Sequence, residues 1–328
     1  MTDLNKTEAL LDILMHSGQE FVSGEEISRQ LSISRTAVWK QINKLREAGY
    51  EFEAIPHKGY RMVSRPERLH APTIRNAIEE GRMGSQVYVL DRTLSTQEEA
   101  KQLAEEGAQE GTLVITEEQS GGRGRMGRKW FSPYGKGVWM SLVLRPGLPL
   151  HLTPQLTLVT GVAVCRAIRQ LTGLQAGIKW PNDIFIEGRK VCGILLESAA
   201  EDGLARYCIA GIGISANLAK EDYPEELKTI ATSLAIELGS EVNRTALIAE
   251  VMKEFEVLYA LYLKEGLQPI AVLWEQLSIH MNQPIQVRGA QGIVTGKAVG
   301  LEASGALLVE VAGGQVVPIF SGDVEGLQ

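Results

Sequence analysis

Apolar residues recur at helical spacing in the first fifty residues of the chain. They predict a helix over residues 7–17 and a second over residues 23–31. A third helix is predicted from Ser34 to Ala48, because its apolar positions lie at i, i+4 and i+7 and form one stripe for burial. That stripe comprises Val38, Ile42 and Leu45.

Two runs of alternating polar and apolar residues follow the third helix. They cover residues 50–55 and 59–63 and predict a β-hairpin. Helix, helix–turn–helix and hairpin within about 60 residues are the arrangement of a winged helix-turn-helix. We therefore expect residues 1–65 to form such a domain, followed by a short linker.

Strand-like and helical patterns alternate through the middle of the chain. Two long helices are predicted, from Pro154 to Leu171 and from Arg244 to about Leu263. The mixture predicts a catalytic-size domain of the α+β or α/β class over residues 66–275. The strand-like runs are Val87–Leu90, Thr112–Glu117, Trp139–Leu144, Ile184–Ile186, Val191–Glu197 and Tyr207–Ile214.

The pattern changes again near Gln276. Short Val/Ile runs separated by glycines then continue toward Gln328, which predicts a small β-barrel domain over residues 276–328. A domain of roughly 50 residues buries too little surface to be more than marginally stable on its own. We expect it to pack on the middle domain.

Composition narrows the class of protein. The chain has 328 residues, of which 44% are hydrophobic and 22% charged, as in ordinary globular proteins. It contains no apolar run that approaches the ~20 residues of a membrane span, and no secretory signal pattern. Its three cysteines form no C-x-x-C pair and its histidines are scattered. These features predict a cytoplasmic protein with no membrane partner and no metal-ligating residues.

Charge is unevenly distributed around a net value of −7. Residues 1–65 carry as many basic as acidic side chains, and their predicted third helix has no acidic residue between Ser34 and Arg46. A basic helix in a neutral domain favours DNA contact by one element, although such a face can also be an ordinary solvated surface. Trp39 on this helix is expected to pack at a rim rather than to stack on a base. The expected DNA contacts, which include two cations of the hairpin, are Ser34, Arg35, Thr36, Lys40, Asn43, Lys44, Lys58 and Arg61.

The segment Gln119–Trp130 is the most informative stretch of the chain. It holds four glycines and four cations directly after a predicted strand. Glycines let the backbone approach an anion, and arginines add bidentate phosphate recognition. The segment formally matches G-x-G-x-x-G, but Trp-Phe-Ser-Pro follows, which cannot open the helix that a dinucleotide site requires. A flexible basic surface loop is the other interpretation.

Two further motifs support a binding site. The stretch from Lys179 to Asp183, Lys-Trp-Pro-Asn-Asp, precedes a predicted hairpin that returns Lys190 toward Asp183. A lysine near an acid is usually a modest surface pair. Beside a Gly/Arg loop, however, Lys190 is a candidate for neutralising a carboxylate and a phosphate during acyl-adenylate formation. Ser95-Thr-Gln97 would otherwise be a plain helix cap.

Together these motifs resemble the biotin protein ligase family, and within it the bifunctional members that combine a ligase with a repressor. The resemblance covers essentially the whole chain in family order: winged helix, Ser-Thr-Gln, Gly-Arg-Gly-Arg-x-Gly-Arg-x-Trp, Lys-Trp-Pro-Asn-Asp, Gly211-Ile-Gly-Ile and the C-terminal barrel. The arginine loop is of the biotin type rather than that of the more distant lipoate ligases. The resemblance implies an α+β catalytic domain of the biotin/lipoate ligase kind, followed by a small SH3-like β-barrel.

The resemblance also implies roles for individual residues, with Arg123, Asp183 and Lys190 carrying the catalysis. The biotin site would comprise Ser95, Thr96, Gln97 and Gln119. The loop that closes over the acyl phosphate would comprise Arg123, Gly124 and Arg125. The adenylate side would comprise Trp130, Asp183, Lys190, Gly211 and Gly213. Family members often have Asn where this chain has Ser215.

The implied activity has two steps. Biotin and Mg-ATP would give biotinyl-5′-AMP, and a lysine of a biotin carboxyl carrier protein would then take the biotinyl group. The resemblance further implies repression of biotin-related genes by a homodimer that biotinyl-5′-AMP promotes on operator DNA. Two alternatives stay open: a monofunctional ligase whose winged helix is a structural appendage, and a protein that is chiefly a regulator.

Overall fold

The computed structural model describes residues 7, 9–11, 13–14, 17–18, 20–47, 50–56, 58–64, 68–78, 81–289 and 292–326. The chain forms two compact units, Met1–Arg68 and Leu69–Gln328. Across the described ranges, no helix has both the length and the apolar character that a membrane crossing needs.

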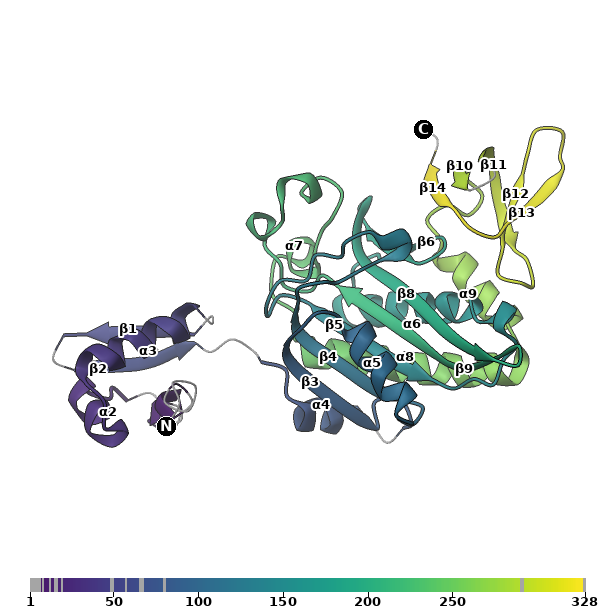
Figure 1. Ribbon diagram of the computed structural model, residues 1–328. Coiled ribbons are helices and arrows are strands. Elements are labelled where there is room, and N and C mark those ends of the chain that lie inside the picture. The colour runs from purple at the N-terminus through teal and green to yellow at the C-terminus, as the bar shows by residue number, and fades with distance from the viewer. Residues whose placement is uncertain are drawn as a thin grey trace. The chain divides into compact units, whose positions relative to one another are not determined.

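The first unit is a helical domain with a β-hairpin (Figure 1). The described residues between 7 and 14 are helical. Helices α2 (Gly24–Leu31) and α3 (Arg35–Glu47) precede the antiparallel strands β1 (Glu51–Ile55) and β2 (Gly59–Ser64). Their shared core contains Leu10, Leu14, Ile27, Val38, Ile42, Leu45, Tyr50 and Phe52. The winged helix-turn-helix arrangement expected from the sequence is confirmed.

The second unit is built on a seven-stranded sheet whose order is β3-β4-β5-β9-β8-β7-β6. Only the β3–β4 pair is parallel, and every other pair is antiparallel. A mainly antiparallel sheet with separate helices is of the α+β class. The strands are β3 (Gln86–Thr93), β4 (Thr112–Gln119), β5 (Val138–Leu144), β6 (Gly177–Lys179), β7 (Asp183–Ile186), β8 (Arg189–Glu201) and β9 (Leu204–Ile214).

Helices cover the two faces of this sheet unequally. The main core lies between the sheet and α4 (Ala71–Ala77), α6 (Gln155–Thr172), α8 (Arg244–Glu265) and α9 (Gln268–Leu277). On the opposite face, α5 (Thr96–Glu105) lies in front of the sheet (Figure 1) and packs on β4, β5 and β9. Because α5 is only ten residues long, it covers only part of this second face of the sheet.

Shorter segments complete the second unit. Helix α7 spans Leu234–Leu238, and short 3₁₀ turns span Arg125–Gly127, Leu150–Leu152, Lys220–Asp222 and Glu225–Leu227.

The C-terminal strands form a separate five-stranded antiparallel sheet in the order β13-β12-β11-β10-β14. Its inward residues, among them Ile285, Val309 and Val324, belong to the main core of the second unit. The expected packing of this small domain on the middle domain therefore holds. The strands are β10 (Pro284–Gly289), β11 (Gly292–Leu301), β12 (Leu307–Glu310), β13 (Val316–Ile319) and β14 (Asp323–Gly326).

Candidate functional site

Three glycines leave a hollow in the part of the second sheet face that α5 does not cover. Gly193 of β8 lies opposite Gly213 of β9, and Gly211 lies opposite Leu195. Because side chains alternate along a strand, the three glycines point to the same face, away from the main core. A Cβ at Gly211 would lie 2.5 Å from Gln97 Oε1, and one at Gly213 would lie 2.7 Å from Trp130 Cε2. Their lack of side chains lets Gln97 and Trp130 rest directly on the strand backbone.

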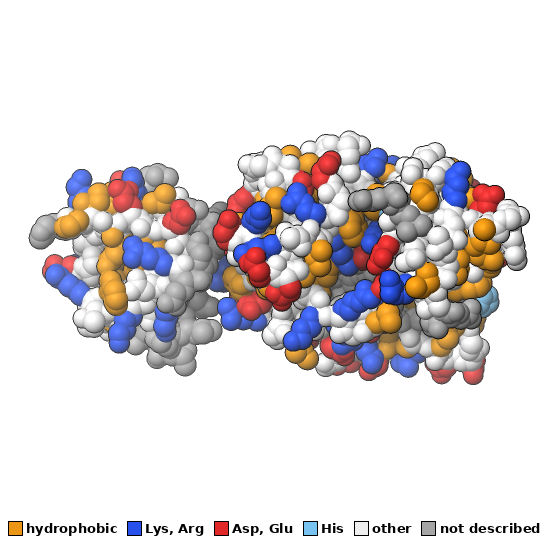
Figure 2. Space-filling view, turned by 90° about the horizontal axis from the view of Figure 1, so that it is seen from above, with side chains coloured by type: hydrophobic (Ala, Val, Ile, Leu, Met, Phe, Trp, Pro, Cys, Tyr) orange, Lys and Arg blue, Asp and Glu red, His pale blue; other side chains and the backbone are white. Residues whose placement is uncertain are grey.

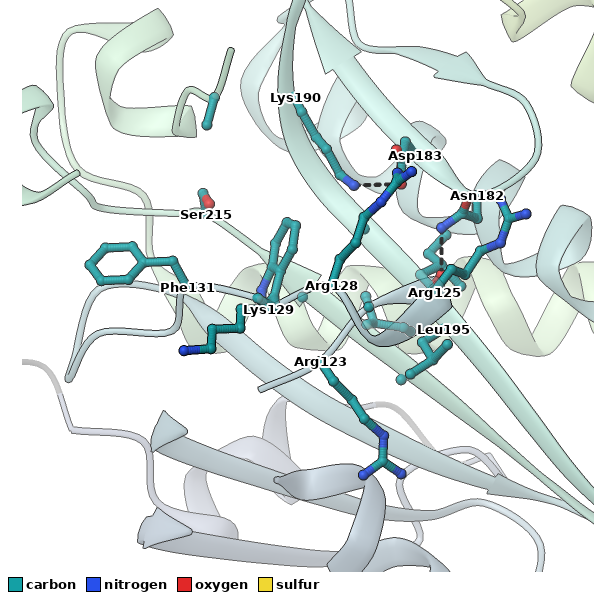
Figure 3. Close-up of a pocket in the computed structure, with 18 of the residues that line it drawn as sticks. Arg123, Arg125, Arg128, Lys129, Phe131, Asn182, Asp183, Lys190, Leu195 and Ser215 are labelled. Carbon is teal, nitrogen blue, oxygen red and sulfur yellow. Dashed lines mark hydrogen bonds and ion pairs between the residues drawn. The ribbon is translucent and has the colours of Figure 1, made fainter. Parts of the chain in front are cut away.

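A pocket of about 570 Å³ opens above these glycines. It brings together every ligase-site residue that the sequence singled out, although these residues come from α5, β4, the arginine loop and the β7–β8 and β9 strands. They are Ser95, Thr96, Gln97, Gln119, Arg123, Gly124, Arg125, Trp130, Asp183, Lys190, Gly211 and Gly213. Figure 3 shows the charged part of this pocket.

One end of the pocket is a network of neutral polar groups. Gln119 Oε1 accepts hydrogen bonds from the Thr96 backbone N–H at 2.9 Å and from Thr96 Oγ1 at 3.1 Å. Gln97 Nε2 donates to the carbonyl oxygens of Leu195 and Ile209. Ser141 Oγ donates to Gln97 Oε1 at 3.0 Å. These bonds fix the amide orientations, so this end is a preorganised polar surface rather than a loose lining.

The other end is dominated by an ion pair on the β7–β8 hairpin. Lys190 Nζ lies 2.7 Å from Asp183 Oδ1, as the predicted hairpin requires, and 5.2 Å from the centre of the Trp130 ring. The two side chains are partly buried, with exposed fractions of 29% and 22%. A cation held between a carboxylate and an aromatic face has a fixed position within the pocket.

The arginines of the loop have different partners. Arg123 pairs with Glu98 of α5 at 2.5 Å and with Glu197 of β8 at 3.2 Å, and it points away from the Lys190–Asp183 pair (Figure 3). Arg125 donates to Asn182 Oδ1 at 2.8 Å, beside Asp183. The structure therefore brings Arg125 to Asn182, the chain neighbour of Asp183. Arg128 extends toward Asp183 itself, whereas Arg123 does not approach the lysine–aspartate pair (Figure 3).

A third arginine connects the loop to the C-terminal sheet. Arg128 forms an ion pair with Asp323 at the start of β14, and both residues line the pocket. The Arg128 hydrogen bond lowers the pKa of Asp323 below its usual range. The C-terminal sheet thus supplies one carboxylate to the pocket wall.

The charge balance of the pocket suits an anion. Six cations line it, against the two carboxylates Asp183 and Asp323, so the wall carries an excess of positive charge. Burial opposes the charge of Arg123, but its bonds to Glu98 and Glu197 outweigh burial and raise its pKa. In the part of the chain that the structure describes, no three His, Cys, Asp or Glu side chains group as a metal site.

A buried ion pair behind the pocket was not anticipated from the sequence. Arg244 Nη1 lies 2.6 Å from Glu117 Oε2, with exposed side-chain fractions of 2% and 4%. Glu117 Oε1 also accepts the backbone N–H of Leu69, the first residue of the second unit. Glu117 is two residues before Gln119, so this pair anchors the strand end that carries a pocket residue.

Other pocket residues also escaped the sequence interpretation. Ser141, Gly193 and Leu195 could have been found by projecting alternate strand positions onto one face, whereas Asp323 left no such signal. Ser215 lines the pocket as well.

The residues expected to contact DNA lie on α3 and the hairpin. Ser34, Arg35, Thr36, Lys40 and Lys44 are exposed along α3 and its start, Asn43 is half-buried, and Lys58 is exposed between the strands. Arg35 pairs with Glu25 at 2.6 Å. Arg61 pairs with Glu53 and lies over the Phe21 ring. Both of these arginines are therefore engaged within the domain.

Comparison with known proteins agrees with this architecture. Residues 6–61 match an HTH domain, residues 89–215 the biotin/lipoate A/B protein ligase family, and residues 280–325 the biotin protein ligase C-terminal domain. The bifunctional ligase/repressor BirA of Bacillus subtilis is 45% identical over 96% of this chain and 97% of its own length. BirA of Escherichia coli is 31% identical over 98% and 97%. The structure of an Aquifex aeolicus biotin protein ligase in complex with biotin and ATP matches 74% of this chain and 99% of that one, at 30% identity and a TM-score of 0.64.

Fold and site together define a protein ligase of the biotin/lipoate class that carries a helix-turn-helix domain. More particularly, the chain belongs to the biotin protein ligase family, among its bifunctional ligase/repressor members.

Proposed function

We propose that the protein activates biotin with ATP, transfers it to a lysine of a biotin carboxyl carrier protein, and represses transcription of biotin-related genes. The observation that carries the ligase half is the single pocket in which all the candidate residues meet. Its neutral polar end and cationic end suit a substrate that combines a polar ring system, a carboxylate and a nucleotide.

The two ends of the pocket suggest how the substrates lie. Biotin would bind at the polar network around Thr96, Gln97 and Gln119, whose hydrogen-bonding groups are already oriented. Its carboxylate would then extend toward Lys190 and Arg125, where the ATP phosphates would meet it. The shape supplies proximity and alignment, which are the main catalytic resources for a reaction between two anions.

The first step is a displacement at phosphorus. The biotin carboxylate oxygen attacks the α-phosphorus of ATP, a new P–O bond forms, and the bond to pyrophosphate breaks. Lys190 and Arg125 would offset the negative charge that gathers there, while Asp183 holds the ammonium of Lys190 in place. Mg²⁺ would arrive bound to ATP and keep phosphate and water oxygens as its ligands. No side chain of the protein acts as a nucleophile.

The second step is acyl transfer. The neutral amine of the carrier lysine attacks the carbonyl carbon of the mixed anhydride, an amide forms, AMP leaves, and the amine loses its proton. The adenylate must survive until the carrier arrives, which requires exclusion of water by the loop from Arg123 to Lys129.

Biotinylation of a carrier domain by the full-length protein, with biotin and ATP, tests the ligase half. Lys190→Ala should form the adenylate about 10²- to 10³-fold more slowly. A protein that biotinylated no carrier and released no pyrophosphate with biotin and ATP would not be a ligase.

The repressor half rests on the helix-turn-helix domain and its acid-free helix α3. We infer that a homodimer promoted by biotinyl-5′-AMP binds operator DNA, and that the protein works in the cytoplasm, where its free, buried cysteines would stay reduced. We also propose 1–65, 66–275 and 276–328 as the functional domains, a division that the three family matches support. Gel shift and carrier biotinylation side by side, with and without biotin plus ATP, separate a bifunctional protein from an enzyme alone or a regulator alone.

A further inference from the structure

The exposed face of α3 contains a large aromatic side chain that the domain does not use. Thr36, Trp39, Lys40 and Asn43 follow one another at i, i+3, i+4 and i+7 and share one face of the helix. Trp39 is 54% exposed, so the rim packing expected from the sequence covers less than half of the residue. Among the described residues, no aromatic ring or cation stacks on it.

Trp39 differs in this respect from the other tryptophans of the chain. Trp139, Trp180 and Trp274 are buried and Trp130 is half-buried, all in the second unit. The core of the first unit is formed without Trp39, because Val38, Ile42 and Leu45 fill the buried stripe of α3. Trp39 therefore lies outside the core of its own domain, and the exposed part of its apolar surface is available to a partner.

The charge around Trp39 identifies the partner as duplex DNA. Helix α3 carries no acidic residue in its first three turns, and Lys40 lies next to Trp39 on the exposed face. Cations bind phosphates of any sequence and position the helix, whereas base edges are read by polar and apolar side chains that reach the groove. The apolar group that a base pair displays in the major groove is the thymine C5-methyl group.

We propose that Trp39 reads a thymine methyl group in the operator and so determines sequence specificity, together with Thr36 and Asn43. This inference rests on the proposed DNA binding and adds the residue that discriminates among sequences. The indole supplies a wide apolar surface that excludes water from the methyl group, and Lys40 supplies a sequence-independent phosphate contact.

Duplexes selected by the wild-type protein allow a direct test. The full-length protein, with biotin and Mg-ATP, is used to select binding duplexes from a random-sequence pool. Affinities of wild type, Trp39→Phe, Trp39→Ala and Lys40→Ala are then measured on the selected duplex. The same measurements are made on versions in which single thymines are replaced by uracil, which lacks only the methyl group.

Trp39→Ala should weaken binding to the thymine duplex roughly 5- to 100-fold, the range for one lost base contact. At the thymine that Trp39 contacts, uracil should weaken the wild type but not Trp39→Ala, so that the two losses do not add. Trp39→Phe should retain most of the discrimination. Lys40→Ala, the matched control, should weaken binding to every duplex alike and reduce the salt dependence by about one ion.

Three results would overturn the proposal. One is additive losses at every thymine. Another is unchanged affinity of Trp39→Ala on the selected duplex. The third is an altered sedimentation coefficient of free Trp39→Ala, which would place the indole in a protein–protein contact. A wild-type protein that selected no duplex at all would instead count against DNA binding itself. Acrylamide quenching gives an independent readout, since the duplex should shield a fluorescence component that Trp39→Phe lacks.

Discussion

Two contacts fix the position of the Lys190 ammonium within the pocket. Its ammonium lies 2.7 Å from Asp183 and faces the Trp130 ring, inside a wall that already carries several cations. Lys190→Ala should reduce biotin-dependent pyrophosphate release about 10²- to 10³-fold, as expected when one contact to the developing charge is lost. Lys228→Ala is the control, because Lys228 also lies 2.7 Å from a carboxylate, that of Glu225, outside the pocket. Near-equal rates for the two variants would refute the role of Lys190.

Gly213 is constrained by the indole that rests on it. A Cβ at this position would overlap Trp130, and the strand leaves no other direction for it. Gly213→Ala should therefore displace the Trp130 ring and raise the KM for ATP severalfold or more, with less change in the affinity for biotin alone. Gly161→Ala is the matched control, since a Cβ there has its nearest neighbours at 3.9 Å. Equal KM values for ATP in the two variants would show that the indole position does not matter for the nucleotide.

Residue types and spacing predicted residues that line the pocket and the Lys190–Asp183 pair, but not the other partners of these side chains. The motifs around Ser95, Gln119 and Lys190 identified the pocket because each places an unusual density of polar groups after a strand. Arg123, by contrast, pairs with Glu98 and with Glu197. Glu197 lies 74 residues further along the chain than Arg123. Which arginines of the loop approach the Lys190–Asp183 pair depends on the conformation of the loop itself. That conformation includes a turn in which Met126 has a positive φ. No periodicity in the sequence encodes this choice.

At the scale of elements, the Glu117–Arg244 pair joins β4 to the first turn of α8. Its side chains are almost fully buried, so removing one partner leaves an uncompensated charge inside the protein. Glu117→Ala should lower the free energy of unfolding by about 3–5 kcal/mol. Glu118→Ala, which breaks the exposed pair with Arg92, should cost at most about 1 kcal/mol. Urea denaturation of the two variants measures both, and similar midpoints would mean that the buried pair is not a structural anchor.

Side-chain contacts hold the arginine loop against its surroundings, and contacts with the substrates must replace them when the substrates bind. Arg123 bridges to α5 and β8, Arg125 to Asn182 and Arg128 to Asp323. We expect trypsin to cleave between Arg123 and Lys129 in the free protein, and biotin plus ATP to suppress that cleavage by engaging the arginines with phosphates. Cleavage at Arg82, an exposed residue in the bend before β3 that does not line the pocket, serves as the internal control. Equal protection at both places, or none, would contradict closure of the loop.

The sequence predicted the principal elements well where their pattern is long. Residues 154–171 became α6 at 155–172, and the strand expected over 207–214 became the end of β9. The hairpin that returns Lys190 toward Asp183 was also predicted, and in the structure Glu187 and Gly188 form its turn. The pairing order of the seven strands was not, since it depends on contacts between segments as distant as β5 and β9. Strand β6 has only three residues and gives no pattern to detect.

At the scale of the whole molecule, the sequence indicated two functions because two patterns coexist in one chain. A neutral, helix-rich beginning with one acid-free helix differs visibly from the glycine-rich and acidic remainder. The small C-terminal sheet was recognised from its glycine spacing, but its contribution to the pocket through Asp323 was not. That contribution depends on how the sheet packs against the strands at Lys179–Asp183, which is a tertiary property.

One copy of the chain has too few free cations on its helix-turn-helix domain to bind DNA tightly, so we expect two copies to associate on the operator. Helix α3 and the hairpin offer few cations for phosphate, and Arg35 and Arg61 are already paired with Glu25 and Glu53. So few contacts give weak binding at physiological salt, whereas two linked copies on adjacent half-sites double the contacts and gain from effective concentration. We therefore expect a dimer on a palindromic operator, and we expect biotinyl-5′-AMP to favour it by ordering the glycine-rich loop, which is costly to fix when empty.

Sedimentation velocity of the full-length protein, with and without biotin plus ATP, tests this expectation. The ligand should shift the protein toward a dimer and raise its affinity for the selected duplex by at least tenfold. Within an incubation just long enough for the wild type, the shift should be absent in Lys190→Ala, which makes the adenylate about 10²- to 10³-fold more slowly. The shift should return when synthetic biotinyl-5′-AMP is added. If the ligand changed neither the sedimentation coefficient nor the DNA affinity of the wild type, the regulatory half of the proposal would be wrong. The ligase half would be unaffected, because the pocket is formed by one chain alone.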